Sequence, residues 1–496
     1  MAASPATVGA LLREQAHSRA DHPLLVCDTE RLSYAEAEIR SARLARGLLA
    51  LGAGKGTHVG LLYPNSADFV VGMLAAARIG AVVIPYSTFA TGPELRGQIV
   101  DSDTEILLAA TAYRGHDYAQ RLADVSAPSL RHLVFDNRIT DSVNDALLTG
   151  TEADVDGCDP LAIVYTSGST GAPKGAVHTH EALLGHQRNL NEIRKLSEHD
   201  RLFCNSPFFW IGGFAFALLA TMVAGSTLVC SDATDAGETL DLLESVRPAI
   251  TNGFTAGIAH LARHPSFADR DLSSMRRGNL YPIMAADARP RDAELRHNML
   301  GMTEAGSVVL LSGDESDQPE HRRGSFGKPA PGFETRIVDP DTGDIGELCI
   351  RGPYLMQHYY KRSREDCFDA DGWFHTGDLV RVDGDGFFYF IGRRGSMIKT
   401  AGANVSPAEV EKAIAKVTGA AAHVFGIPDP ERGQLVAAVV VADGSAFDEA
   451  ALRDKLKPEL STYKIPRRFI AMRAADIPIL SSGKVDMQKL SAVFDG

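Results

Sequence analysis

The sequence predicts an α/β protein in which a large N-terminal part precedes a small C-terminal α+β domain. Residues 1–160 alternate helical patterns with short β-branched runs, as in strands buried between helices. A β-rich region punctuated by glycine and aspartate, with segments at Gly346–Gly352 and Gly384–Ile391, comes before a boundary near Gly392–Gly395. A compact mixed pattern of about 100 residues comes last. We therefore expect domains at residues 1–394 and 395–496, joined by a short hinge.

Local signals place the first elements. Ser33 and Glu36 form a capping-box pattern that starts a helix, which runs to about Leu51 and stops at Gly52. The glycine cluster from Gly52 to Gly56 superficially suggests a dinucleotide-binding loop. However, it follows a helix and precedes a strand, the reverse of the order that such a loop requires. We therefore interpret it as a helix stop and turn, followed by a strand at Val59–Tyr63, a helix from Asn65 to Ile79 and a strand at Ala81–Ile84.

The stretch Cys204–Ser231 contains no charged residue and is long enough to span a bilayer. Gly212, Gly213 and Gly225 interrupt it, whereas a spanning helix needs roughly 20 apolar residues without such breaks. The sequence therefore predicts a buried helix at Phe214–Ala224 and a strand at Thr227–Cys230, and no membrane span.

The C-terminal domain begins its pattern at Ser406. This residue is expected to cap a helix, with Pro407 at the first helical position and Glu409 completing a capping box. The domain should continue with strands at His423–Ile427 and Leu435–Ala442, a helix near Asp448–Leu460 and a last strand around Phe469.

Composition limits the classes of function. The 496 residues include 50 Lys and Arg against 63 Asp and Glu, a net charge of −13. That balance argues against nucleic-acid binding by general attraction, although it allows a small basic cleft for a phosphorylated cofactor. The six cysteines form no CxxC pair and no Cys/His cluster, so we expect them to be reduced, mostly buried and not zinc ligands. The first residues carry no secretory signal, which predicts a cytoplasmic protein.

The strongest chemical signal follows a strand at Leu161–Tyr165. The chain enters a loop rich in hydroxyls and glycines that ends at Lys174, where backbone N–H groups and the lysine can cradle a triphosphate. The loop differs from the P-loop of GTPases because Gly175 follows the lysine and Pro173 opposes an immediate helix. A flexible surface loop is the alternative. The candidate phosphate-binding residues are Thr166, Ser167, Gly168, Ser169, Thr170, Gly171 and Lys174.

Further candidates lie downstream. Thr303 offers a hydroxyl for a phosphate oxygen, and Glu304 offers a carboxylate for Mg²⁺, which prefers oxygen ligands. Asp378 follows a tight turn and suits the two hydroxyls of a ribose, to which Arg393 could make a second contact. Each of these alone is typical of a solvated turn.

Taken in order, the motifs resemble the adenylate-forming superfamily of acyl-CoA synthetases, firefly-type luciferases and peptide-synthetase adenylation domains. The resemblance covers nearly the whole chain from Gly80. It includes the segments Gly346–Leu348, Gly372–Asp378, Gly392–Arg393, Ile398–Gly402, Pro407–Glu411 and Pro478–Lys484. It implies the fold of that superfamily, with a mobile C-terminal domain and two steps that use ATP, Mg²⁺ and CoA. A carboxylate displaces pyrophosphate to give an acyl-adenylate, which a thiol then attacks.

The resemblance also implies roles. Lys484 bridges the carboxylate and the ATP oxygens, the loop from Thr166 to Lys174 holds the β- and γ-phosphates, and Glu304 holds Mg²⁺. In the second step the segment from Lys399 to Gly402 moves inward, where Gly402 permits close passage of a pantetheine arm. Departures from the family pattern are Leu300 in place of an aromatic on adenine, Gly395 in place of the usual Asp or Lys pivot, a shortened segment at Met284–Ala288, and Met487 in place of an arginine.

The acyl pocket in relatives lies beside the segment Pro207–Gly213. Trp210 stands where many members have histidine, and Gly212 and Gly213 suggest an apolar cavity with room near the backbone. A plain core is the alternative. We include Ala285 and Ala286 in the same pocket lining. No charged residue is evident to bind an amino-acid ammonium group, which favours a fatty, aryl or alicyclic acid.

The predicted function is therefore an ATP-dependent ligase that converts a hydrophobic carboxylic acid and CoA to acyl-CoA, AMP and pyrophosphate. The alternatives are a ligase that passes the acyl group to a separate carrier protein, and a non-catalytic nucleotide- or acyl-binding protein. A luciferase-like oxygen-using enzyme has no separate support. The expected partners are small molecules and not nucleic acid. Peripheral membrane contact and a homodimer are left open.

Overall fold

The computed structural model describes residues 4–123, 125–166, 173–338, 345–393, 397–442, 448–478 and 485–494. The side chains of Ala256, Arg393 and Gln488 lie outside this description. The chain divides into a larger compact unit (Met1–Thr88, Ile99–Tyr165 and Gly175–Gly392) and a smaller one (Phe89–Gln98, Thr166–Lys174 and Arg393–Gly496). The predicted domain boundary at 394/395 falls outside the described residues. None of the described helices is long and apolar enough to cross a membrane.

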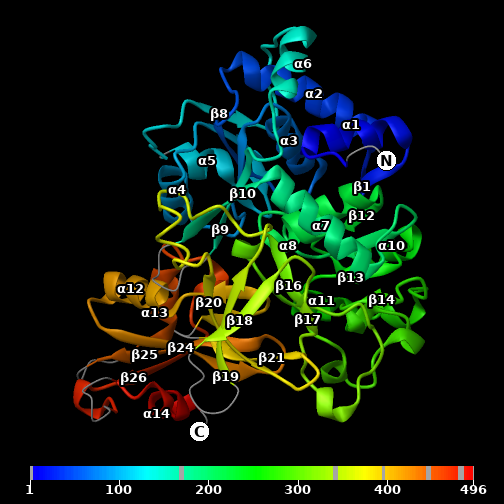
Figure 1. The fold of residues 1–496 in the computed structure, drawn as a ribbon. Coiled ribbons are helices and arrows are strands. Elements are labelled where there is room, and N and C mark those ends of the chain that lie inside the picture. Colours follow the sequence, from blue (N-terminus) through cyan, green and yellow to red (C-terminus); the bar gives the residue numbers. More distant parts are fainter. Residues whose placement is uncertain are drawn as a thin grey trace. The chain divides into compact units, whose positions relative to one another are not determined.

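One six-stranded sheet of the larger unit joins segments from far apart in the sequence (Figure 1). The strand nearest the N-terminus, Pro23–Cys27, pairs in parallel with the strand Thr227–Cys230, so that Leu25 lies opposite Leu228. All neighbouring strands in the sheet are parallel except the last pair, in which Glu30–Ser33 runs antiparallel to Pro23–Cys27. In spatial order the strands are β14 (Arg277–Gly278), β13 (Ile250–Asn252), β11 (Arg201–Cys204), β12 (Thr227–Cys230), β1 (Pro23–Cys27) and β2 (Glu30–Ser33).

A second six-stranded sheet contains the strands predicted near the N-terminus. From β9 through β4, β3 and β5 to β8, each strand pairs in parallel with the next. Every residue of β4 and β5 is buried, as expected for a parallel sheet. The spatial order is β10 (Lys174–Thr179), β9 (Pro160–Thr166), β4 (Val82–Pro85), β3 (His58–Leu62), β5 (Ile106–Ala109) and β8 (His132–Phe135).

The helices of this part start mostly where side chains can cap them. The Ser33–Glu36 capping box is confirmed at the start of α2. The predicted start of α3 at Asn65 is wrong by two residues, because the Ser66 side chain caps the helix and Ala67 is its first residue. The Asn65 amide instead binds the backbone of Ser206 and Phe208. The helices are α1 (Val8–Ser18), α2 (Tyr34–Ala50), α3 (Ala67–Arg78), α4 (Gly92–Asp101), α5 (Tyr118–Ala123), α6 (Asp145–Ala153), α7 (His180–Arg194), α10 (Ala236–Val246) and α11 (Thr255–Ala262).

The uncharged stretch is a buried helical segment followed by a strand, as predicted. The helix is not regular, however. It begins as α8 (Ile211–Gly213), passes through π-helical turns at Phe214–Leu219 and continues as α9 (Ala220–Ala224). Every residue from Phe214 to Met222 is buried, so the segment belongs to the core.

Two smaller sheets follow in the larger unit. They share an apolar core that includes Leu300, Val309, Leu348, Ile350 and Phe374. The three-stranded sheet contains β15 (Leu300–Met302), β16 (Ser307–Leu311) and β17 (Lys328–Pro329). The four-stranded sheet contains β18 (Glu334–Val338), β19 (Ile345–Arg351), β20 (Phe374–Val382) and β21 (Phe388–Arg393). A short hairpin joins β6 (Ala112–Tyr113) to β7 (His116–Asp117).

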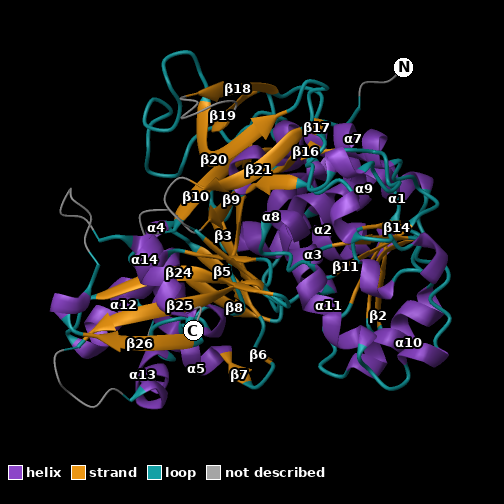
Figure 2. Ribbon diagram, turned by 90° about the horizontal axis from the view of Figure 1, so that it is seen from below, coloured by secondary structure: helices purple, strands orange, loops and turns teal. Residues whose placement is uncertain are grey.

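The C-terminal domain has the predicted α+β structure. Its sheet has the order β23 (Ala403–Val405), β22 (Ile398–Thr400), β25 (Gly433–Val441) and β24 (Ala422–Asp429), with β26 (Arg468–Met472) also paired to β25. Its helices are α12 (Pro407–Thr418), which packs on β24, α13 (Glu449–Leu456) and α14 (Met487–Ser491) (Figure 2).

The predicted capping box at the start of α12 is half formed. The Ser406 hydroxyl accepts the Glu409 N–H at 3.4 Å, as predicted. The Glu409 carboxylate does not close the box, because it accepts a hydrogen bond from the buried Lys464 Nζ at 2.8 Å. A long-range ion pair has replaced a local contact.

The six cysteines are free, and Cys27, Cys204, Cys230 and Cys349 are buried. This confirms the prediction that most of these thiols are buried. Cys158 is exposed and Cys367 is half-buried.

Candidate functional site

Asp378, the predicted ribose ligand, lies in a bulge of β20. Glu347 on β19 is opposite Leu379, whereas Cys349 is opposite His375, so the three residues 376–378 face the single residue Leu348. Gly377 has φ +73°, a left-handed conformation that favours glycine. Bulges of this kind re-aim side chains beside functional sites.

Side chains hold this bulge in place. The Gly377 N–H, which has left the strand ladder, donates to Glu347 Oε1 at 2.9 Å. The Thr376 hydroxyl donates to the Leu348 carbonyl oxygen at 2.7 Å and accepts the Asp378 N–H at 3.0 Å. Asp378 is buried, and these contacts within its own sheet fix its backbone.

Thr303 and Glu304 form one tight turn, at Thr303–Ala305, between β15 and β16. Glu304 is buried, and its Oε1 accepts a hydrogen bond from the Tyr359 hydroxyl at 2.6 Å. The Glu304 carbonyl oxygen also accepts the Met356 N–H at 2.8 Å. The segment around Tyr359 thus fixes both the backbone and the carboxylate of the predicted Mg²⁺ ligand.

His178 on β10 holds the other side of this turn. Its Nε2 donates to the Thr303 carbonyl oxygen at 2.8 Å. Burial lowers the pKa of His178 to about 4, so the ring is neutral at neutral pH. Its Nδ1 has no hydrogen-bond partner among the described residues, so a second proton would be unsatisfied.

The predicted phosphate loop is described only at its two ends. Thr166 is the last residue of β9, and Lys174 is the first residue of the neighbouring strand β10. Ligands of open α/β sheets bind beyond the carboxyl ends of parallel strands, which is where Thr166 lies. The other predicted residues Ser167, Gly168, Ser169, Thr170 and Gly171, together with Gly395, Lys484 and the Arg393 side chain, lie outside the described residues.

The predicted acyl-binding segments follow β11 and β14, two parallel strands of one sheet, and a third loop follows β13, which lies between them. Trp210 lies after β11, Phe254 after β13 and Ala285 after β14, so their loops leave the same edge of the sheet. Two asparagines tie these loops together. Asn205 Nδ2 donates to the Phe254 carbonyl oxygen at 2.8 Å, and its Oδ1 accepts the Phe254 N–H at 2.9 Å. Asn279 makes the same pair of contacts with Gly253, at 2.8 and 3.1 Å.

Aromatic rings gather at this edge. Trp210 makes edge-to-face contacts with Phe209 and Phe254, with ring centroids 5.7 and 5.6 Å apart. The sequence suggested room near the backbone at Gly212 and Gly213, and at Gly213 main-chain atoms occupy that room. A Cβ atom at Gly213 would lie 2.1 Å from the Pro207 carbonyl oxygen, and one at Gly212 would lie 3.3 Å from Ser206 Oγ. Close packing of main chain explains Gly213, and the aromatic side chains supply the apolar surface.

The remaining candidates of the larger unit differ in exposure. Ala285 is buried and its N–H donates to the Met275 carbonyl oxygen at 2.8 Å, whereas Ala286 is exposed. Leu300 is 3% exposed and packs in the core shared by the two smaller sheets.

Lys399 and Gly402 belong to one hairpin of the C-terminal domain. Strands β22 and β23 are joined by the two residues Ala401 (φ +49°) and Gly402 (φ +86°). Two consecutive positive φ angles are those of a type I′ turn, in which glycine is preferred at the second position. The turn therefore requires Gly402 irrespective of any ligand. Lys399 is exposed on β22.

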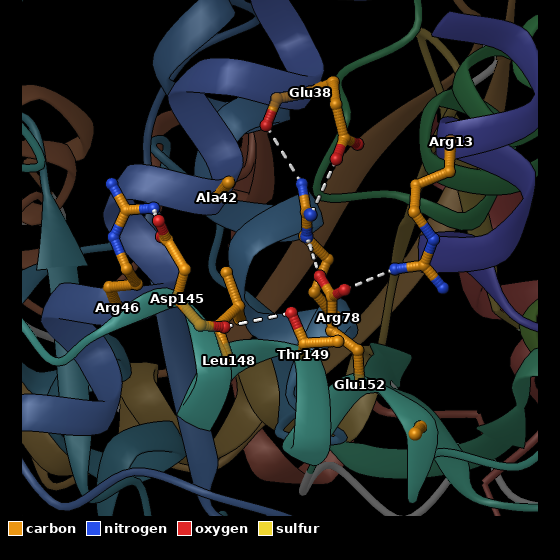
Figure 3. Close-up of a pocket in the computed structure, with 10 residues that line it drawn as sticks. Arg13, Glu38, Ala42, Arg46, Arg78, Asp145, Leu148, Thr149 and Glu152 are labelled. Carbon is orange, nitrogen blue, oxygen red and sulfur yellow. Dashed lines mark hydrogen bonds and ion pairs between the residues drawn. The ribbon is translucent and has the colours of Figure 1, made fainter. Parts of the chain in front are cut away.

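A cavity of about 480 Å³ lies elsewhere, lined by residues of α1, α2, α3 and α6 (Figure 3). Its charges are paired with one another. Arg78 binds Glu38 at 2.7 Å and also binds Glu152, which in turn binds Arg13. The cavity contains none of the predicted site residues, and its charged lining does not suit an apolar acyl group.

Sequence reasoning missed several residues that hold these sites, namely His178, Asn205, Asn279, Glu347 and Tyr359. His178 was visible in the sequence as one of two histidines at strand spacing, but its partner Thr303 is 125 residues away. No local pattern specifies such a partner.

Comparison with known proteins identifies the family of the chain. A family model for AMP-binding enzymes matches residues 12–360, and one for the AMP-binding enzyme C-terminal domain matches residues 409–484. The feruloyl-CoA synthase of an Amycolatopsis species is 32% identical over 476 residues, 92% of each chain. Long-chain-fatty-acid–CoA ligase FadD13 of Mycobacterium tuberculosis is 31% identical over 475 residues, again 92% of each chain. The amide bond synthetase McbA from Marinactinospora thermotolerans has the same fold, with a TM-score of 0.81 at 24% identity over 98% of this chain and 99% of that one.

The chain therefore belongs to the AMP-binding enzyme family, and its fold is that of the adenylate-forming enzymes. Within this family it is an AMP-forming acid–thiol ligase, because the relatives that match it over nearly their whole length are acyl-CoA synthetases and ligases.

Proposed function

We propose that the enzyme activates a hydrophobic carboxylic acid, whether fatty, aryl or alicyclic, with ATP and transfers the acyl group to CoA. The observation that carries this proposal is the contact of Trp210 with Phe209 and Phe254 at the sheet edge where three loops meet. The segment Cys204–Ser231 brings no charged residue to this edge. Two relatives are named for a phenolic and a long-chain acid, which supports the same class.

In the first step the acid's carboxylate attacks the α-phosphate of ATP and pyrophosphate leaves. Two anions must meet, so positive charge is the main requirement. We assign this role to Lys484, which bridges the two substrates, and to Lys174 with the hydroxyls and N–H groups of residues 166–171. Thr303 contributes a hydroxyl to a phosphate oxygen.

Mg²⁺ fits the Thr303–Glu304 turn by the chemistry of its donors. A carboxylate and a hydroxyl are hard oxygen donors, and Tyr359 fixes the carboxylate through Oε1, which leaves Oε2 for a cation. When bound there, Mg²⁺ would neutralise charge on the phosphate oxygens.

The nucleoside is assigned to residues of the larger unit and the end of β21. Asp378 accepts hydrogen bonds from the ribose hydroxyls, Arg393 makes a second ribose contact, and Leu300 gives apolar contact to adenine. The bulge supports the first role, because the Glu347 and Thr376 side chains fix the backbone that carries Asp378.

In the second step the CoA thiol attacks the acyl-adenylate. We propose that residues 395–496 move as a domain about Gly395, which withdraws Lys484 and brings the hairpin from Lys399 to Gly402 toward the pantetheine arm. Glycine accepts the required φ/ψ change at little steric cost. The type I′ turn supports this assignment, since it gives the hairpin a defined tip.

The test measures pyrophosphate release and loss of the CoA thiol in parallel, across aliphatic, aromatic and alicyclic acids with ATP and Mg²⁺. Both signals with one class of acid would establish the proposal and identify the acid. Pyrophosphate without thiol loss would favour transfer to a carrier protein. Nucleotide binding without either signal, for every acid tested, would favour a non-catalytic protein. The cytoplasmic location is a further proposal, tested by cell fractionation.

A further inference from the structure

A second cluster of reactive side chains lies on the sheet that carries Asp378, on the partner strand of its bulge. Glu347 and Cys349 are two residues apart on β19, and His375 is the direct cross-strand partner of Cys349. One ligand atom from each lies within 4.8 Å of the other two. His375 Nδ1 is 3.4 Å from Cys349 Sγ and 3.3 Å from Glu347 Oε2.

These distances suit a tetrahedral metal ion. Zinc bonds of about 2.0–2.3 Å to nitrogen, oxygen and sulfur place neighbouring ligand atoms roughly 3.3–3.6 Å apart. Thiolate, imidazole and carboxylate are the ligand types that zinc takes, and three protein ligands leave the fourth position for water. The His375 side chain is 45% exposed, so water and ions reach the cluster from that side.

The residues around the cluster also suit a metal site. His375 Nε2 faces Asp369 Oδ2 at 3.6 Å, and an outer carboxylate commonly orients a metal-bound histidine. Arg336 Nη2 holds the same Asp369 oxygen at 2.9 Å. The two carboxylate oxygens of Glu347 have different partners: Oε1 accepts the Gly377 N–H at 2.9 Å, and Oε2 faces His375. A cation on Oε2 would therefore leave the Asp378 bulge intact.

We propose that Glu347, Cys349 and His375 form a Zn²⁺ site. On binding, the Cys349 S–H bond breaks, the proton goes to solvent and a sulfur–zinc bond forms. The proposal departs from the sequence-based expectation that no cysteine is a zinc ligand. It does not depend on the proposed substrate or on Mg²⁺ at Glu304, because none of these three residues has a role in that proposal beyond the support of the bulge by Glu347.

The test uses the full-length protein after treatment with a chelator. Co²⁺ is added as a spectroscopic substitute for Zn²⁺, and a thiolate-to-cobalt charge-transfer band is measured. We expect one equivalent of Co²⁺ to produce the band and Zn²⁺ to displace it. Cys349→Ser should abolish the band, and His375→Asn should weaken Co²⁺ binding by at least about tenfold. Cys158→Ser, which alters an exposed thiol, should leave the charge-transfer band and the Co²⁺ affinity unchanged.

A second readout covers the case in which Cys349→Ser disturbs the buried core. Zn²⁺ should raise the unfolding temperature of the wild-type protein and of Cys158→Ser, because it binds only the folded site, but not that of His375→Asn. His375 is half exposed, so its replacement should preserve the fold. The proposal would be overturned by the absence of a charge-transfer band in the wild-type protein, or by a band that survives in folded Cys349→Ser.

Discussion

His178 Nε2 lies 2.8 Å from the carbonyl oxygen of Thr303, so a neutral histidine on β10 positions the turn that carries Thr303 and Glu304. The two residues are 125 positions apart. The contact connects the strand that begins with Lys174 to the turn proposed to bind phosphate and Mg²⁺, and it gives the buried ring a function beyond packing.

His178→Phe removes this hydrogen bond while keeping a planar ring. We expect a loss of stability of about 1–3 kcal/mol and a higher KM for ATP, because a buried carbonyl group loses a donor and the turn is freed. His186→Phe is the matched control. His186 is buried too, and its Nε2 donates at 3.0 Å to the carbonyl oxygen of Val308 on β16, not to a residue of the turn. Steady-state kinetics and thermal unfolding distinguish the two, and an equal change in KM for both variants would contradict the positioning role.

Acid should destabilise the larger unit through its buried histidines. Burial lowers the pKa values of His178, His180 and His186 to about 4, with Asp159 facing His180, and Arg194 and His178 facing His186. The unfolded histidine has a pKa of about 6.5, so the unfolded state binds more protons between these values, and stability falls as pH falls. From about pH 7 to about pH 5 we expect a loss of about 2 kcal/mol per histidine.

Calorimetric unfolding at several pH values measures this effect. His186→Phe should flatten the dependence of the unfolding temperature on pH, because one of the three titrating rings is gone. His199→Gln changes a side chain that is 87% exposed and should leave the slope unchanged. Identical slopes for the wild-type protein and His186→Phe would count against this explanation.

Tyr359→Phe tests the support of Glu304. Loss of the 2.6 Å hydrogen bond to Glu304 Oε1 should raise the Mg²⁺ concentration for half-maximal rate by about two- to tenfold. Tyr360→Phe is the control, since the neighbouring hydroxyl donates to Asp103 Oδ2 at 2.9 Å. A Mg²⁺ titration of the adenylation rate gives both values. If the two variants respond alike, Tyr359 does not act through Glu304.

Gly377→Ala tests the bulge at Asp378. Its φ of +73° makes a side chain cost about 1–2 kcal/mol, and the strain should displace Asp378 and raise the KM for ATP. Gly386→Ala places the same strain (φ +81°) in an open turn where an added Cβ meets no atom within 4 Å. Comparable loss of stability in both variants, with a raised KM only for Gly377→Ala, is the expected result of unfolding and kinetic measurements. An unchanged KM in Gly377→Ala would separate the bulge from nucleotide binding.

Lys484→Ala tests the first chemical step. We expect pyrophosphate release to fall by at least about a hundredfold, whereas CoA ester formation from supplied acyl-adenylate stays largely intact. Lys489→Ala changes a lysine whose side chain is 77% exposed and should affect neither step. Equal losses in both steps for Lys484→Ala would refute the proposed role.

Local structure followed the sequence where neighbouring residues decide it. The Ser33–Glu36 box and the Ser406 cap arise from side chains within a few positions of the backbone groups that they satisfy. The prediction failed where a distant residue competed. The Glu409 carboxylate accepts a hydrogen bond from Lys464 and does not bind its local capping partner. The Asn65 amide binds the backbone of Ser206 and Phe208 and does not cap the helix that follows it.

The sequence by itself determined the order of the motifs, the family and the residue types that its chemistry requires. It also determined where the helices at Tyr34 and Pro407 begin, since capping acts over three or four residues. Tertiary structure alone decided how those residues are held: the strand register that creates the bulge at Asp378, the hydrogen bond from His178 to Thr303, and the meeting of Glu347, Cys349 and His375. Strand pairing and buried hydrogen bonds join segments far apart in the chain, and no local pattern of side chains encodes which distant partner will meet them.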